Sequence, residues 1–151
     1  MTTQAPQGAG APERRVPPRP MPFPENPALT APFWEAAKRH ELVMQRCKNC
    51  TNYIHFPREQ CPVCFSQDLE WTQVSGKGRV YAFTNVYQAQ HPAFQDGTPY
   101  TFAIVQLDEG PRMVTNVVGC KPEDVQCDMR VEATYDDASD EWTLVKFQPA
   151  K

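Results

Sequence analysis

The sequence predicts a mainly β protein in which an N-terminal helix and a rubredoxin-like zinc ribbon precede an OB-type, five-stranded Greek-key barrel. Three observations predict this fold class. Two Cys-x-x-Cys pairs lie close together, one helical stretch comes before them, and five strand-like runs follow residue 76. Paired cysteines supply the ligands of a structural metal site, and short strands separated by turn residues are typical of small barrels.

The helix expected before the cysteines begins at Thr30, which can cap its first turn, and Pro32 fits the turn that follows. Phe33 and Trp34 come next, and the helix is expected to end at His40. Adjacent residues point about 100° apart on a helix, so these two aromatic side chains cannot share one narrow seam. Either both cover the ribbon, or one of them faces a partner protein.

The cysteine pairs, Cys47 with Cys50 and Cys61 with Cys64, are the most informative feature of the sequence. Each pair is expected to form a tight turn that directs both sulfurs to one point, so the two turns can face each other. Four thiolates suit a tetrahedral Zn²⁺ and leave no open position for water or substrate, which predicts a structural zinc. His55 is therefore not needed as a ligand. A rubredoxin-like iron site and two separate dithiols are the alternatives.

Strand-like runs account for most of the remaining chain. Three of them, residues 42–46, 53–56 and 69–74, alternate with the cysteine pairs and form the ribbon. Five more are expected to form the barrel: residues 80–88, 100–108, 112–118, 129–136 and 142–147. Pro122, Glu123 and Asp124 suggest one helical turn between the third and fourth of these, as in an OB-type barrel.

Composition divides the chain into three expected parts. Residues 1–27 form a Pro-rich leader that holds half of the 16 prolines and is expected to be disordered. Residues 28–75 are expected to hold the helix and the ribbon, and residues 76–151 the OB barrel.

No apolar run is long enough for a membrane span, and the N-terminus has no signal-peptide core, so we expect a cytoplasmic protein with no membrane association. Cys120 and Cys127 are then expected to be free thiols.

A zinc ribbon followed by an OB barrel first suggests nucleic-acid binding, but the charge balance disfavours it. In residues 76–151, acidic residues outnumber basic ones by 11 to 7, and acidic pairs at strand ends would repel a phosphate backbone. Nucleic-acid binding therefore remains the second hypothesis. The sequence also has no nucleophile elbow, metalloprotease helix or phosphate-binding loop, so no catalytic residue is assigned.

A series of motifs resembles one known family over residues 28–148. In chain order they are Pro32-Phe33-Trp34, Gln45-Arg46-Cys47-x-x-Cys50, Cys61-Pro62-x-Cys64, Gly76-x-Gly78, Pro99-Tyr100, Leu107-Asp108-Glu109-Gly110-Pro111 and Pro122-Glu123-Asp124-Val125. Together they resemble the acyl-CoA-associated zinc-ribbon/OB-fold proteins, long labelled a domain of unknown function. The chain differs from the family pattern at Asp128, where the family tends to have glycine.

The resemblance implies a function as well as a fold. Members of that family are accessory subunits of thiolase-superfamily enzymes, including steroid side-chain aldolases that act on CoA thioesters. It implies a non-catalytic, zinc-containing subunit of a hetero-oligomer, such as a heterotetramer around a thiolase dimer, that takes part in a retro-aldol or thiolase-type reaction. A similar domain can also be fused to a hydratase-like domain in the steroid systems.

An acyl-CoA ligand would need cations for its phosphates and a flat surface for its adenine. The candidates for this contact are Arg46, Lys48, Tyr53, Phe56 and Arg58, all close to the cysteines. The candidates for the partner interface are Phe33, Trp34, His91 and Phe94, the last two in the long loop between the first two barrel strands. The alternative is that these cations are simply solvated and the loop is an ordinary connection.

Overall fold

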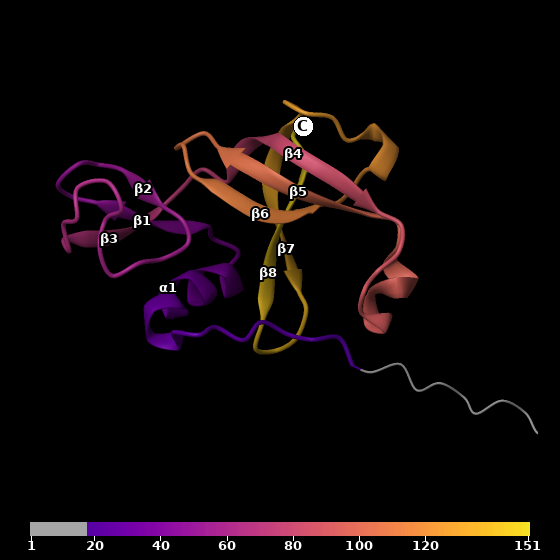
Figure 1. Ribbon diagram of the computed structural model, residues 1–151, viewed down its shortest axis with the longest axis horizontal. Coiled ribbons are helices and arrows are strands. Elements are labelled where there is room, and N and C mark those ends of the chain that lie inside the picture. Colours follow the sequence, from indigo (N-terminus) through magenta and orange to yellow (C-terminus); the bar gives the residue numbers. More distant parts are fainter. Residues whose placement is uncertain (1–17) are drawn as a thin grey trace, which may run out of the picture.

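A computed structural model of the chain describes residues 18–151. Figure 1 shows a small ribbon sheet at the left, a β-barrel at the right, and one helix packed below the junction between them. The described residues form one α-helix, α1 (Pro27–Lys38), and two 3₁₀ turns, η1 (Pro92–Gly97) and η2 (Pro122–Asp124). The strands are β1 (Val43–Cys47), β2 (Tyr53–Ile54), β3 (Leu69–Gln73), β4 (Lys77–Val86), β5 (Tyr100–Leu107), β6 (Arg112–Val117), β7 (Arg130–Asp137) and β8 (Thr143–Pro149).

The five later strands close into a barrel in the order β4-β5-β6-β8-β7, with β6 and β8 in parallel contact at Val117 and Phe147. This is the expected OB-type topology, and the predicted mainly β fold is confirmed. Inward-facing residues of β5 and β6 are buried, whereas Phe102 and Val114 point outward and are each 44% exposed. The outer face of these two strands is therefore apolar and accessible.

Helix α1 begins earlier than the sequence predicted. Asn26 is its N-cap and accepts a hydrogen bond from the amide of Leu29 at 3.1 Å, and Pro27 takes the first helical position. Thr30 lies inside the helix, where its hydroxyl donates to the carbonyl of Asn26 at 3.1 Å. The expectation that Thr30 caps the helix is thus wrong, because Asn26 already occupies that position. The helix also ends at Lys38, before His40.

One continuous core joins the helix, the ribbon and the barrel. Phe33 and Ala37 of α1 and Met44 of β1 belong to the same buried cluster as Val105 and Phe147 of the barrel. A polar contact lies beside it: the His40 ring nitrogen Nε2 is 3.1 Å from an oxygen of Asp137, which also accepts a hydrogen bond from the Thr143 hydroxyl at 2.7 Å. The ribbon is therefore held against the barrel by packing as well as by the chain connection.

The backbone at Asp128 has the turn conformation that the sequence suggested. Asp128, the residue that replaces the family's glycine, has a φ of 63°, which Asp tolerates better than most residues. Residues 1–17 of the Pro-rich leader, which include Arg14 and Arg15, lie outside the described residues. The end of the leader is described and contacts the barrel: Arg19 lies 3.7 Å from Asp136 of β7, and its guanidinium is 5.6 Å from the centre of the Phe94 ring. None of the helices in the described part of the chain has the length and apolar character of a transmembrane span.

Candidate functional site

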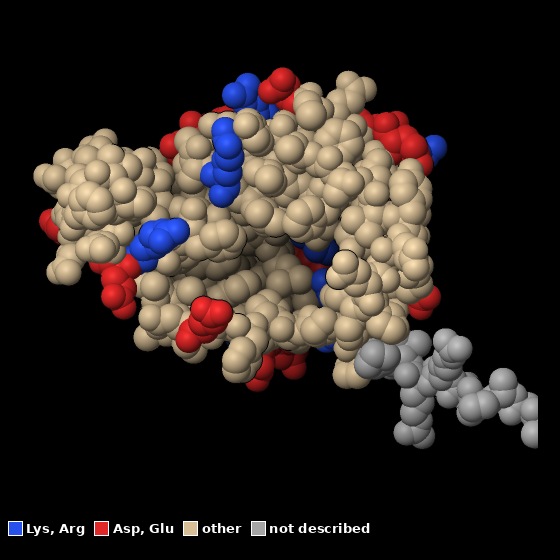
Figure 2. Space-filling model, viewed as in Figure 1, with Lys and Arg blue, Asp and Glu red and all other residues tan. Residues whose placement is uncertain are grey.

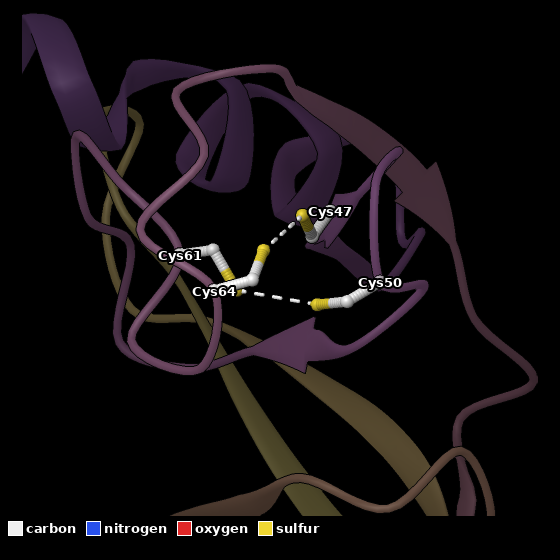
Figure 3. Close-up of side chains that lie close together, drawn as sticks. All are labelled: Cys47, Cys50, Cys61 and Cys64. Carbon is white, nitrogen blue, oxygen red and sulfur yellow. Dashed lines mark hydrogen bonds between the residues drawn. The ribbon is translucent and has the colours of Figure 1, made fainter.

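The four predicted cysteine ligands converge at one point between the two turns of the ribbon (Figure 3). Their sulfur atoms all lie within 4.8 Å of one another. The Sγ atoms of Cys47 and Cys64 are 3.6 Å apart, and those of Cys50 and Cys61 are 3.5 Å apart. A tetrahedral site with Zn–S bonds of about 2.3 Å places its sulfurs about 3.8 Å apart, so these two separations suit a zinc ion.

The two turns that present these sulfurs have the same construction. The amide of Thr51 donates to the carbonyl of Cys47 at 2.8 Å, and the amide of Phe65 donates to that of Cys61 at 3.0 Å. Thr51 and Phe65, each one residue after a cysteine pair, both have a φ of 59°. Cys47 and Cys61 are fully buried, whereas their partners in each pair are half-buried. This repeated geometry explains why a short sequence can aim four side chains at one ion.

Zinc in this cluster would have four protein ligands and no position for substrate. The ion would therefore supply cross-linking of the two turns rather than Lewis-acid chemistry. Around it the ribbon is a three-stranded sheet in the order β2-β1-β3, with a second small cluster formed by Cys47, Cys61 and Ile54. A sheet of this size has too little apolar surface to be stable alone, so a metal cross-link is the expected stabiliser.

Beside the ribbon lies an apolar groove of about 320 Å³ that is enclosed by α1, the loop after β2, and strands β5, β6 and β8. Figure 2 shows this face of the molecule hollowed between the ribbon and the barrel. Its walls include Trp34, His55, Phe56, Phe102, Val114 and Leu144. Of these, Phe56 is 62% exposed, which is unusual for a phenylalanine and marks the groove as a candidate binding surface.

A second hollow, the arginine pocket, has a volume of about 440 Å³ and lies on the other side of the same loop. It is lined by Tyr53, His55 and Arg58 of the ribbon and by Arg112 at the start of β6. Arg112 could not be predicted from sequence as part of this pocket, because only the folded barrel brings it to the same hollow as Arg58. Its guanidinium stacks 3.6 Å from the centre of the Tyr81 ring, which fixes its position.

The five candidates for CoA contact do not lie together. Tyr53 and Arg58 line the arginine pocket, while Phe56 lines the apolar groove. Arg46 is 3.7 Å from Glu70, and Lys48 is 3.0 Å from Asp68, so both cations already have carboxylate partners. The pKa of Lys48 is raised by the hydrogen bond to Asp68.

The four interface candidates also have different environments. Phe33 is 8% exposed and packs in the core, whereas Trp34 is half-buried and stacks edge-on against Trp142 at 4.9 Å between ring centres. His91 caps η1 by accepting the Ala93 amide at 3.2 Å, and Phe94 packs against it. These last two lie at the end of the barrel away from the ribbon (Figure 1).

His55 lies between the two hollows and packs against the rings of Phe33 and Phe56. Burial among these groups lowers the pKa of His55 to about 4. The imidazole is therefore neutral at pH 7 and forms part of the apolar wall. Its folded pKa lies below the unfolded value of about 6.5, so its contribution to stability is complete above pH 6.5 and declines as the pH falls toward 4.

Replacing His55 with phenylalanine is accordingly expected to flatten the pH dependence of stability. Between pH 7 and pH 5 the wild type should lose about 2 kcal/mol more unfolding free energy than the variant, because only its unfolded state gains a proton there. Urea unfolding with excess zinc at both pH values measures this difference. Equal losses in the two proteins would contradict the assignment of a neutral, half-buried His55.

Two sequence profiles match consecutive parts of the chain. A profile described as "ChsH2, rubredoxin-like zinc ribbon domain" matches residues 34–70, and one described as "ChsH2, C-terminal OB-fold domain" matches residues 71–136. The chain belongs to the ChsH2 family. The predicted zinc ribbon, its structural zinc and the resemblance to acyl-CoA-associated proteins are thereby confirmed.

Relatives of this ChsH2-family chain include a probable enoyl-CoA hydratase alpha subunit of Thermomonospora curvata, 42% identical over 119 residues, and the benzoylsuccinyl-CoA thiolase subunit BbsA of Geobacter metallireducens, 36% identical over 89 residues. The alignments cover 78% and 59% of this chain but only 37% and 58% of those proteins. A solved chain described as "Ltp2-ChsH2(DUF35) aldolase" is 39% identical, with a TM-score of 0.77, over 85% of this chain and 100% of that one.

Proposed function

We propose that this chain is an accessory subunit that binds and completes a thiolase-superfamily enzyme acting on acyl-CoA thioesters. The reaction of the complex would be a retro-aldol cleavage or a thiolase-type step, with a steroid-like CoA thioester as one candidate substrate. The observation that supports this most directly is the match to the aldolase chain across its whole length. The hydratase and thiolase subunits among the relatives support the same substrate class. A cytoplasmic location, where thiols stay reduced, is part of the proposal.

The environments of the histidines support a non-catalytic role for the chain alone. All three histidines lie among the described residues. His40 contacts Asp137, His55 is half-buried between aromatic rings, and His91 caps η1. Each therefore has a structural role, and the partner would supply the reacting groups.

The second hypothesis, nucleic-acid binding, is disfavoured by the character of one face of the barrel. In other OB folds the corresponding face binds oligonucleotides. That face is formed by β5 and β6, and it presents Phe102 and Val114 rather than a basic groove. Lys146 and Arg19 lie near it, but both contact the carboxylate of Asp136, at 2.7 Å and 3.7 Å. Arg112, at the start of β6, stacks on the ring of Tyr81. Single-strand binding requires a positive groove as well as aromatic side chains.

Co-expression of this chain with a thiolase-like protein of the same host would test the proposal. We expect the two to elute as one complex, the partner to lose solubility or activity without this chain, and this chain alone to leave CoA thioesters unchanged. Separate elution, with partner activity unaffected, would contradict the proposal. Fluorescence anisotropy with single-stranded DNA and RNA is expected to show no binding at physiological salt; a tight, salt-sensitive complex would instead favour the second hypothesis.

A further inference from the structure

The barrel is incompletely closed between β6 and β8. Among the described residues, the backbones of these strands pair only at Val117 and Phe147. One step along, the hydroxyl of Thr115 spans the gap and donates to the carbonyl of Val145 at 3.0 Å. Over residues 112–114 of β6, no hydrogen bond joins the two strands within residues 18–151, so the edge of β6 is unpaired there.

This free edge directs backbone groups into the gap. At the turn that joins β5 to β6, the Leu107 amide donates to the Pro111 carbonyl at 2.9 Å. Along an antiparallel ladder, residues that bond the neighbouring strand alternate with residues whose N–H and C=O point the other way. In this register Met113 and Thr115 bond β5, whereas the amide and carbonyl of Val114 face the gap. A donor and an acceptor are therefore available there for another strand.

The apolar groove runs along this edge rather than over one face of the barrel. It is lined by the inward-facing Met113 and the outward-facing Val114 of β6, and in the same way by Leu144 and Val145 of β8. Figure 1 shows α1 beside the lower part of β8, where Trp34 forms a further wall of the groove. An apolar trough beside unpaired backbone groups is the arrangement to which an extended peptide adds as a strand.

We propose that an extended segment of the thiolase-like partner adds to the free edge of β6 and places alternate side chains in the apolar groove. The inference rests on the proposed function for the identity of the partner, and it adds the surface and the backbone mode of contact. A hollow on the outer side of α1 shares Thr30 and Trp34 with the groove, so one partner can contact both.

The lining of the groove sets the chemistry of the added segment. Among the described residues that line it, Lys146 alone is charged, and its ammonium lies 2.7 Å from Asp136. The low pKa of His55 keeps that side chain neutral at pH 7. The segment is therefore expected to be uncharged and rich in β-branched or aromatic residues. The chain's own leader suits the edge poorly, because half of the prolines fall in residues 1–27 and proline has no amide to donate.

Val114→Pro and Val114→Ala separate the backbone contact from the side-chain contact. Proline removes the amide that faces the gap and leaves the bonds to β5 in place, whereas alanine keeps the amide and shortens the side chain. Surface plasmon resonance with the zinc-loaded full chain and the purified partner gives the Kd of each complex. We expect a Kd about tenfold higher for Val114→Pro than for Val114→Ala, the effect of one lost backbone hydrogen bond.

Gln73→Pro is the matched control for the proline variant. The Val74 amide donates to the Leu42 carbonyl at 2.9 Å, so by the same alternation the amide of Gln73 points away from β1. Gln73 is exposed, ends β3 and lies outside the groove. Its replacement by proline is expected to leave the Kd unchanged, and melting temperatures verify that each variant is folded.

Hydrogen exchange of the wild type is a second measurement that needs no variant. In the free chain the amide of Val114 should exchange faster than those of Met113 and Thr115, which β5 protects. Binding of the partner should slow exchange at Val114 at least tenfold. This selective gain at an alternate residue distinguishes strand addition from general covering of the surface.

Each other outcome contradicts the inference. A complex in which the Val114 amide stays unprotected, or in which the proline and alanine variants bind equally, would overturn the added strand and leave the proposed function in place. Failure to form any complex would overturn both. Protection of Val114 by octanoyl-CoA without the partner would assign the groove to an acyl chain, and protection that rises with the concentration of the chain alone would assign it to a second copy.

Discussion

Cys61→Ser is expected to abolish stoichiometric zinc binding and to unfold the ribbon. Cys61 is fully buried, and its sulfur lies 3.5 Å from that of Cys50, so a serine there removes one of four ligands without space for a substitute. Structural zinc contributes about 10–16 kcal/mol to the folding of small modules, more than a sheet of this size can replace. Because the ribbon and barrel share one core, the melting temperature of the whole chain should also fall.

Elemental analysis and amide resonances test this expectation. The wild type should contain one zinc per chain, and the variant less than a tenth of that amount, with loss of the dispersed signals of residues 41–75. Cys127→Ser is the matched control, because Cys127 is exposed and lies outside the cluster. Full zinc content in the Cys61 variant, or iron with a visible absorption band in the wild type, would refute the assignment.

The fold was largely predictable because its strongest determinants are local. The x-x spacing of each cysteine pair fixes a turn, and the alternation of residues along strands such as β8 indicates which side faces the core. The start of α1 was not predictable in the same way. Asn26-Pro27 and Thr30 with Pro32 are both acceptable starts, and only the observed hydrogen bond to the Leu29 amide distinguishes them.

The arginine pocket could be predicted only in part, because one of its walls comes from the barrel and is brought to the ribbon by long-range packing. The cysteines, Tyr53 and Arg58 lie in one short segment, so their grouping can be inferred from sequence. Arg112 joins them only because the β5–β6 turn packs beside the ribbon, and no spacing pattern signals that contact. Likewise, the neutralisation of Arg46 by Glu70 follows from the pairing of β1 with β3, which places the two residues opposite each other.

The interface candidates are also separated by their environments. Phe33 is buried, so its truncation would destabilise the fold rather than report on a partner. Trp34 is half-buried and borders a hollow of about 400 Å³ on the outer side of α1, together with Phe23 and Trp142. Phe23 is 95% exposed. Exposed aromatic side chains beside a concave surface are typical anchors of protein–protein interfaces, so we propose that the thiolase-like partner contacts this hollow.

Trp34→Ala is accordingly expected to weaken the complex with the partner about thirtyfold, since truncating an interface anchor costs about 2 kcal/mol or more. Trp34 also packs on Trp142, so a second variant is needed to separate binding from stability. Phe23→Ser should weaken the complex without changing the melting temperature, because a side chain that is 95% exposed contributes little to folding. Tyr87→Ser, at an exposed position outside this hollow, is the control. Surface plasmon resonance on the purified pair gives the affinities, and equal affinities for all three variants would place the interface elsewhere.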